Sequence, residues 1–366
     1  MLTPEYLEKL DYNKVIDIYN KLNKDIVVEI IKSIDGIEDI SSITKNQIKT
    51  LARNNGKGIF FRALEKASNI DYETKQELKK IYLRTVKEDL KGYKELYEYR
   101  ELPYELTPYQ MQILNAGLLN NGGELSNFVN TIAFASEEAY VEAVDRAYQE
   151  VISGGVDYYT ATNNIYKELA QKGITLTDKN GRHYQIDNAV RYSVLNGVHQ
   201  TTNLINRDIE KILGCDGYEV TAHIGARPTH AEYQGKQFAV NKKDAKKYGI
   251  GLWKDVEDLW KEHNCKHTYF GIILGVSEPQ YTKSEIKEMK TAKVKVDDKE
   301  VPYYEATQKQ RYYERKIREK KRAIEILKEC NKDTESLNNE LKKYNDKYYS
   351  LCKESGINPI YERTRV

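Results

Sequence analysis

The sequence contains 366 residues, of which 40% are hydrophobic and 31% are charged, and its formal net charge at pH 7 is +2. A chain of this length is expected to fold into two or three domains of ordinary size. No stretch approaches the roughly 18 consecutive apolar residues that cross a bilayer, which excludes an integral membrane protein and predicts no membrane anchor. Because the charges nearly balance, no overall electric field draws the chain to nucleic acid.

The cysteines and the start of the sequence indicate a product made in a cytoplasm. The first six residues lack the basic segment and the apolar stretch of a secretory signal. Four cysteines are too few and too scattered for a disulfide framework, so we expect free thiols. They are Cys215, Cys265, Cys330 and Cys352. Tyrosine outnumbers phenylalanine 30 to 6, which favours surfaces and interfaces that are partly apolar and partly hydrogen-bonding.

Residues 1–107 are expected to form a helical region without catalytic features. Apolar residues recur at three- and four-residue steps in two stretches, which is the periodicity of an amphipathic helix. These positions are Val15, Ile18, Leu22, Ile26, Ile30 and Ile34 in the first stretch and Leu78, Ile81, Leu83, Val86, Leu90, Tyr93 and Tyr97 in the second. Ser42 or Thr44 could cap a shorter helix between them. Pro108 marks the end of the region.

Residues 108–214 are expected to form a second helical region. Stretches that contain paired glycines, at 120–123 and 153–155, predict two loops inside it. Near 174–186, two short alternating segments flank Asn180-Gly181. This dipeptide favours a β-hairpin, because both turn positions want positive φ.

A long helix and then a compact module are expected to follow. The helix should begin with Asp187 as its N-cap and end at Gly214. In residues 215–282 glycine and histidine cluster, the periodicity becomes irregular, and residues 218–222 have the alternation of a strand. We therefore expect a small α+β module with β-hairpins and functional loops.

Residues 283–366 predict a basic helical tail. Residues 309–328 hold nine Lys or Arg against three Glu. A coiled-coil-like stripe follows, formed by Leu337, Leu341, Tyr344, Tyr348 and Leu351. The heptad slips near residues 331–336, which indicates either a stammer in one long helix or a hairpin of two helices. The expected fold is mainly α, with a helical N-terminal body, the α+β module and a long helical or coiled-coil tail.

Four of the six histidines and one cysteine lie close together in the sequence. They are His223, His230, His263, Cys265 and His267. Imidazole and thiolate ligands together suit Zn²⁺. However, the spacing matches no standard zinc finger, and on a strand Cys265 would point away from the two histidines beside it. We therefore favour hydrogen bonding within a compact fold, without metal or cofactor, and keep zinc as the alternative.

The same residues allow an enzyme hypothesis. Cys265 could act as a nucleophile with a histidine base, or the histidines could form a nuclease site that binds one metal ion. Neither an orienting third group nor the carboxylates that would complete such sites are visible. The sequence also lacks a phosphate-binding glycine loop and a Gly-x-Ser-x-Gly elbow. We expect no enzymatic activity, with an enzyme acting on nucleic acid or protein as the alternative.

The basic helix offers a candidate nucleic-acid contact. Arg311, Arg315, Arg318 and Arg322 step round one side of it and could lie along a phosphate backbone. The other interpretation is a solvated face of a coiled coil. Packing against another protein through the Leu337–Leu351 stripe is the favoured role of the tail.

One segment resembles a known family. Residues 219–238 read EVTAHIGARPTHAEYQGKQF, and a second run, Asn264-Cys265-Lys266-His267, precedes a glycine-containing segment. Both motifs, in this order, closely resemble the signature of the phage minor capsid protein 2 family, which belongs with the Mu F-like head-morphogenesis proteins of tailed phages. Tyr233 and Lys266 stand where that family often has Trp and Arg. The residues that carry the motif are His223, Gly225, Arg227, Pro228, His230, Gln234, Gly235, Asn264, Cys265 and His267.

The resemblance implies a structural role. Such proteins are minor components of the virion, made in the bacterial host, that associate with the portal protein and with the major capsid or scaffold protein. Some also contact the packaged double-stranded DNA or assist its delivery. In this interpretation Gly225 and Gly235 supply turns, Pro228 stiffens the loop, and the histidines and Cys265 join two loops into one small domain.

Overall fold

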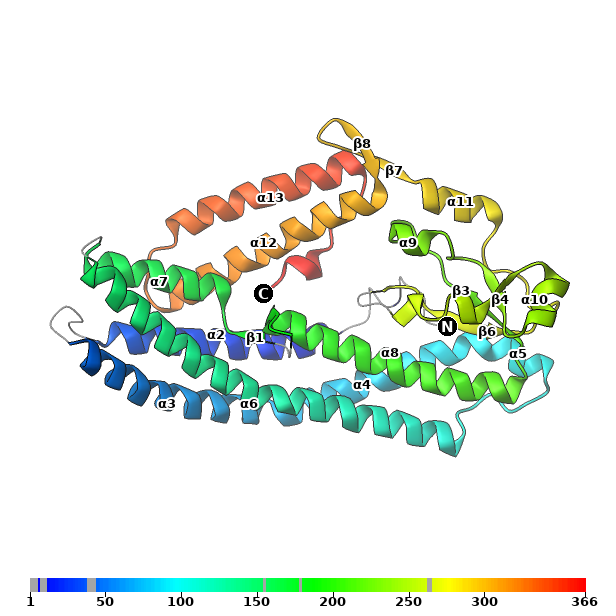
Figure 1. The fold of residues 1–366 in the computed structure, drawn as a ribbon, viewed down its shortest axis with the longest axis horizontal. Coiled ribbons are helices and arrows are strands. Elements are labelled where there is room, and N and C mark those ends of the chain that lie inside the picture. The colour runs from blue at the N-terminus through cyan, green and yellow to red at the C-terminus, as the bar shows by residue number, and fades with distance from the viewer. Residues whose placement is uncertain (1–5, 7–11, 38–43, 154–155, 178–179, 262–264) are drawn as a thin grey trace.

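The structure is mainly helical, with small sheets (Figure 1). The computed structural model describes residues 6, 12–37, 44–153, 156–177, 180–261 and 265–366. Long helices lie side by side along the longest axis and form an elongated body. The largest sheet lies at one end, and two C-terminal helices lie along one side of the body. The expectation of a mainly α fold is confirmed.

The helices of the first region bury most of the predicted apolar positions, but Leu83 is exposed and does not belong to the buried face. They are α2 (Asn13–Asp35), α3 (Lys45–Asn69), α4 (Asp71–Leu90), the 3₁₀ turn η1 (Lys91–Tyr93) and α5 (Lys94–Tyr99). Thr44 caps α3 in a capping box with Gln47, as one of the two predicted caps. The prediction that this helix is shorter than its neighbours is wrong, because α3 has 25 residues and both neighbours have fewer. The alternative cap, Ser42, lies outside the described residues.

Helix α6 runs without interruption for 45 residues, from Pro108 to Ile152. The loop predicted at 120–123 is therefore wrong. Asn121 Nδ2 donates to the Ser193 carbonyl (3.0 Å) and to Ser193 Oγ (2.8 Å), and both groups belong to the neighbouring helix α8. These buried contacts between helices outweigh the poor helix propensity of Asn and Gly. Helix α6 does end before Ser153, as predicted.

The hairpin and the helix after it were located correctly. Helix α7 (Tyr158–Lys172) leads into strands β1 (Thr175–Thr177) and β2 (His183–Gln185), which pair antiparallel. Helix α8 (Ile186–Leu213) follows and ends at Gly214 in the left-handed conformation. Its N-cap is Gln185 and not Asp187, because the strand runs directly into the helix. Asp187 instead lies in the first turn, 3.5 Å from Arg318.

Residues 217–272 form a four-stranded sheet in the order β5-β4-β3-β6. Its strands are β3 (Gly217–Val220), β4 (Gln237–Ala239), β5 (Gly251–Leu252) and β6 (Tyr269–Ile272). The connecting elements are α9 (Pro228–Ala231), α10 (Lys242–Tyr248) and the 3₁₀ turns η2 (Trp253–Asp255) and η3 (Leu259–Lys261). Strand β3 is central and pairs antiparallel with β4 and β6. We call residues 215–282 the module.

The tail contains a hairpin of two helices, and not one long helix with a stammer, which were the two structures that the sequence left open. It contains α11 (Lys283–Thr291), the antiparallel strands β7 (Lys293–Val296) and β8 (Lys299–Pro302), α12 (Tyr303–Glu329), α13 (Glu335–Ser355) and the 3₁₀ turn η4 (Tyr361–Thr364). Helices α12 and α13 pack against each other. Leu337, Tyr348 and Leu351 of the predicted stripe are buried within this chain. The β7–β8 hairpin was not predicted.

One hydrophobic core links these parts. Its buried residues come from α2, α3, α4, α6, α7 and α8, and also include Phe270 and Ile272 of the module and Ile326 and Leu327 of α12. A second, smaller core within the module contains Trp253 and Trp260. The module and the tail are thus anchored on the helical body.

Candidate functional site

The two sequence motifs meet because strands β3 and β6 pair. The ladder continues beyond β3, since the backbone N–H of Thr221 donates to the Thr268 carbonyl at 2.9 Å. The backbone N–H of Thr268 in turn donates to Thr221 Oγ1 at 2.9 Å. The loop after β3 therefore lies beside the segment that leads into β6. Segments about 40 residues apart in the sequence form one site.

Three side chains of the motifs come together at this point. Cys265 Sγ lies 3.4 Å from His230 Nδ1 and 3.4 Å from His267 Nδ1. The expectation that Cys265 points away from its neighbouring histidine is wrong for His267, because residues 265–268 are not a strand and side chains there do not alternate. We call His230, Cys265 and His267 the His/Cys cluster.

Gln234 holds the cluster from one side. Its Oε1 accepts the backbone N–H of His223 (3.1 Å) and lies 3.1 Å from His267 Nε2. The ring of His223 stacks at a tilt beside that of His267, with 4.5 Å between the ring centroids. His223 thus belongs to the surroundings of the cluster.

The cluster is largely shielded from solvent. His230 and His267 are 1% and 2% exposed, and Cys265 is half-buried. The indole of Trp260 packs against both histidine rings, at centroid distances of 5.5 and 5.3 Å. Burial, reinforced by the neighbouring His223 and His230, lowers the pKa of His267 to about 2. His267 is therefore neutral at physiological pH. The sequence analysis did not identify Trp260 as part of the site. Its position was a usable signal, because the chain has only two tryptophans and Trp260 lies just before the second motif.

The remaining motif residues shape the loops around the cluster. Gly225 and Gly235 both have positive φ, at 75° and 67°. Pro228 occupies the first turn of α9, which carries His230. Asn264 and His263 lie outside the described residues.

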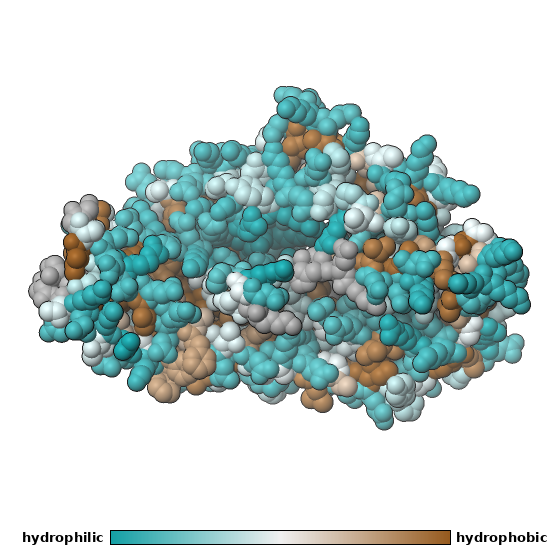
Figure 2. All heavy atoms as spheres, viewed as in Figure 1, coloured by the Kyte–Doolittle hydropathy of each residue, from teal (hydrophilic) through white to brown (hydrophobic). Residues whose placement is uncertain are grey.

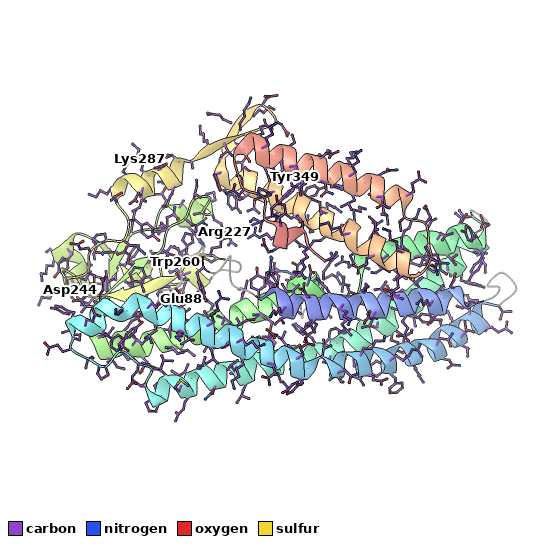
Figure 3. The ribbon with its side chains drawn as sticks, turned by 180° about the vertical axis from the view of Figure 1, so that it is seen from behind. Glu88, Arg227, Asp244, Trp260, Lys287 and Tyr349 are labelled. Atoms are coloured by element: carbon purple, nitrogen blue, oxygen red, sulfur yellow. The ribbon has the colours of Figure 1, made fainter. Side chains whose placement is uncertain are left out.

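A cavity of about 410 Å³ opens beside the cluster, between the module and the tail. His223, His230, Cys265 and His267 line one side of it, and residues of α12 and of the segment 357–363 line the other. Arg227 extends from the module toward the C-terminal helices (Figure 3). The approach is close, because a Cβ on Gly225 would lie 2.7 Å from the ring of Tyr303.

The four arginines of the basic helix differ in their surroundings. Arg322 is buried and donates to the Gln171 carbonyl (2.9 Å) and to Gln185 Oε1 (2.6 Å). Arg318 donates to the Arg363 carbonyl within the tail, and its Nε lies 3.5 Å from Asp187 Oδ2 on α8. Burial lowers the pKa of both guanidinium groups. These two side chains hold the tail on the body. Arg311 lines the cavity, and Arg315 is exposed. Contact with DNA stays a prediction.

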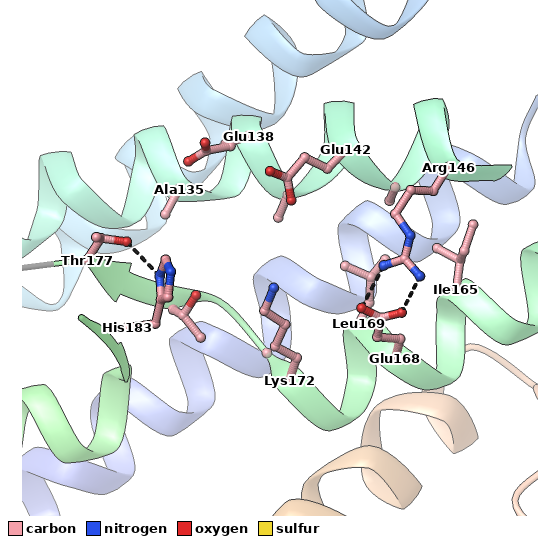
Figure 4. Close-up of a pocket in the computed structure, with 14 residues that line it drawn as sticks. Ala135, Glu138, Glu142, Arg146, Ile165, Glu168, Leu169, Lys172, Thr177 and His183 are labelled. Atoms are coloured by element: carbon pink, nitrogen blue, oxygen red, sulfur yellow. Dashed lines mark hydrogen bonds and ion pairs between the residues drawn. The ribbon is translucent and has the colours of Figure 1, made fainter. Parts of the chain in front are cut away.

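A second cavity, of about 530 Å³, lies between α6, α7 and the β1–β2 hairpin (Figure 4). Arg146 and Glu168 form an ion pair across it at 2.6 Å, and Thr177 Oγ1 lies 3.0 Å from His183 Nδ1. Glu138 and Glu142 on its wall are exposed. Because its charged groups are solvated, it lacks the shielded, converging ligands of the His/Cys cluster.

Comparison with known proteins decides the family. The family model for phage minor capsid protein 2 matches residues 2–351. The chain belongs to the phage minor capsid protein 2 family. The match extends well beyond the two motifs and includes the helical body and most of the tail. Neither the curated proteins nor the solved structures gave a significant match.

Family membership identifies the chain as a structural protein of the phage head. A minor capsid protein is located in the virion and interacts with other head proteins. The family is one of structural proteins, which supports the expectation that the chain is not an enzyme. Among the described residues, no helix is both long and apolar enough to cross a membrane.

Proposed function

We propose that this minor capsid protein is incorporated in low copy at the portal vertex, where its helical body binds the portal protein. The observation that carries the proposal is the family match, which extends over nearly the whole chain. A long, multi-helix body anchored to a module and a tail presents extended side surfaces, as a connector between larger head proteins requires (Figure 1).

An apolar patch on the body supplies the binding surface. Phe61 of α3 and Phe134 of α6 are 65% and 63% exposed, and both rings contact Phe60, with 5.3 and 4.8 Å between centroids. Figure 2 shows apolar residues gathered on this edge of the molecule, over α3 and α6. Exposed aromatic rings, phenylalanine included, are enriched in protein interfaces, where a few anchor residues contribute most of the binding free energy. The patch is assigned to the portal protein.

Co-purification with the portal protein of the same phage tests this assignment. Replacing both rings (Phe61→Ser with Phe134→Ser) should weaken portal binding by at least about tenfold, the effect of losing one interface anchor. The thermal melt should stay close to that of the wild type, because both rings are exposed. Tyr159→Ser is the matched control, since Tyr159 is 74% exposed on α7, away from the patch. Equal portal binding by wild type, double variant and control would contradict the proposed surface.

A further inference from the structure

The His/Cys cluster has the composition and spacing of a metal site. Within the part of the chain that the structure describes, it is the one group of three or more His, Cys, Asp or Glu side chains close enough to share an ion. The three ligand atoms all lie within 4.8 Å of one another. They come from α9 and from the segment before β6, so an ion here would cross-link the two sequence motifs.

The two sulfur–nitrogen distances agree with tetrahedral coordination. Zinc binds a thiolate at about 2.3 Å and an imidazole nitrogen at about 2.0–2.1 Å. At a tetrahedral angle, these bonds place sulfur and nitrogen about 3.6 Å apart. The two observed distances from Cys265 Sγ to the histidine Nδ1 atoms are 3.4 Å. The ligand atoms of the two histidines lie within 4.8 Å of each other, whereas a tetrahedral site places two nitrogens about 3.3 Å apart. Zinc binding therefore requires the side chains to close around the ion.

Gln234 fixes the tautomer of His267 that binding requires. A backbone N–H can only donate, so the Gln234 atom that accepts from His223 is its carbonyl oxygen. The same oxygen lies 3.1 Å from His267 Nε2, so that nitrogen carries the proton. Nδ1 of His267 then presents its lone pair to Cys265. Metal-binding histidines commonly donate their second ring nitrogen to such an acceptor.

We propose that His230 Nδ1, Cys265 Sγ and His267 Nδ1 bind one Zn²⁺ ion, whose fourth position faces the cavity between the module and the tail. Two imidazoles and one thiolate are ligands that zinc prefers, and the indole of Trp260 forms an apolar wall beside them. The ion would stabilise the module by cross-linking α9 to the segment that precedes strand β6. This inference does not depend on the proposed portal contact, because it concerns the module alone.

Metal analysis of the purified full chain tests the proposal. We expect one zinc per chain, and replacement by Co²⁺ should give the visible absorption of tetrahedral cobalt with a thiolate charge-transfer band. Cys265→Ser should lose the charge-transfer band, and His267→Ala should lose stoichiometric zinc. His183→Gln and Cys352→Ser are the controls. They remove a histidine on β2 and a cysteine on α13, far in the sequence from the cluster, and should keep both signals.

A second variant keeps the test informative if direct ligand variants fail to fold. Gln234→Leu leaves the ligands in place and removes the acceptor that orients His267, so zinc affinity should fall by about 10–100-fold. Chelation should lower the melting temperature of the wild type, and added Zn²⁺ should restore it. A wild-type chain that contains no stoichiometric zinc, gives no cobalt–thiolate band and melts at the same temperature with or without Zn²⁺ would overturn the proposal. The cluster would then be held by hydrogen bonds alone.

Discussion

Glu210 is a buried carboxyl group that connects the helical body to the module. It lies in the last turns of α8 and accepts hydrogen bonds from Tyr93 Oη (3.1 Å) and Tyr218 Oη (3.1 Å), which belong to η1 and β3. Burial raises its pKa from 4.5 to about 7, even though both tyrosine hydrogen bonds act in the opposite direction. The folded protein therefore binds a proton here that the unfolded chain releases near pH 4.5.

The elevated pKa of Glu210 predicts how stability depends on pH. Because the folded pKa lies above the unfolded value, the stabilising contribution is complete below about pH 4.5 and is lost as the pH rises to about 7. The loss is on the order of 3 kcal/mol. Glu210→Gln should remove this dependence, whereas Glu95→Gln on the exposed face of α5 should leave it unchanged. Denaturant unfolding at pH 5 and pH 7.5 measures both. An unchanged pH dependence in Glu210→Gln would show that other groups cause it.

At the scale of whole elements, the crossing of α6 and α8 depends on small residues. A Cβ on Gly197 would lie 2.5 Å from Tyr82 Oη and 2.7 Å from Asn121 Cγ. The side chains of Tyr82 on α4 and Asn121 on α6, or the helices that carry them, must therefore shift to accept a side chain there. Gly123 lies on α6 two residues after Asn121. It is exposed, and a Cβ on it would meet no atom within 4 Å.

These two glycines should respond in opposite directions to alanine. Gly197→Ala should destabilise the fold by about 1–3 kcal/mol, the usual cost of overpacking. Gly123→Ala should stabilise it by about 0.5–1 kcal/mol, because alanine has the higher helix propensity. Thermal melts of the two variants beside the wild type provide the measurement. A stabilised Gly197→Ala variant would show that the helices do not approach this closely.

Local patterns predicted the elements whose features are local. The period of α2, the Asn-Gly hairpin and the left-handed Gly214 all follow from residues within a few positions of one another. Local patterns failed where contacts between residues far apart in the sequence determine the secondary structure. The glycines at 122 and 123 indicated a loop, but hydrogen bonds from Asn121 to α8 keep α6 continuous.

The candidate site shows the same division. Its residue types were visible in the sequence, including His230, Cys265 and His267. Their geometry was not, because the pairing of β3 with β6 sets it. Likewise, the burial of Arg322 and the partial burial of Arg318 follow from contacts with α7, α8 and the C-terminal segment that no local pattern encodes.

At the scale of the whole molecule, the body, the module and the tail share one core. Buried side chains of α12 are part of the hydrophobic core of the body, and Arg322 forms hydrogen bonds that connect α12 to α7 and β2. The tail is therefore part of the fold and not a free coiled coil. Surfaces for other head proteins must then be found on the outer faces, and the patch of Phe61 and Phe134 is the one proposed above.

A minor structural component of the phage head must be present in the purified phage particle. Quantitative mass spectrometry of particles from the parent phage measures this. We predict that the protein is present in the particles in far fewer copies than the major coat protein, as the proposed position at a single vertex requires. Its absence from particles, while it is abundant in the lysate, would show that it is not a component of the phage head.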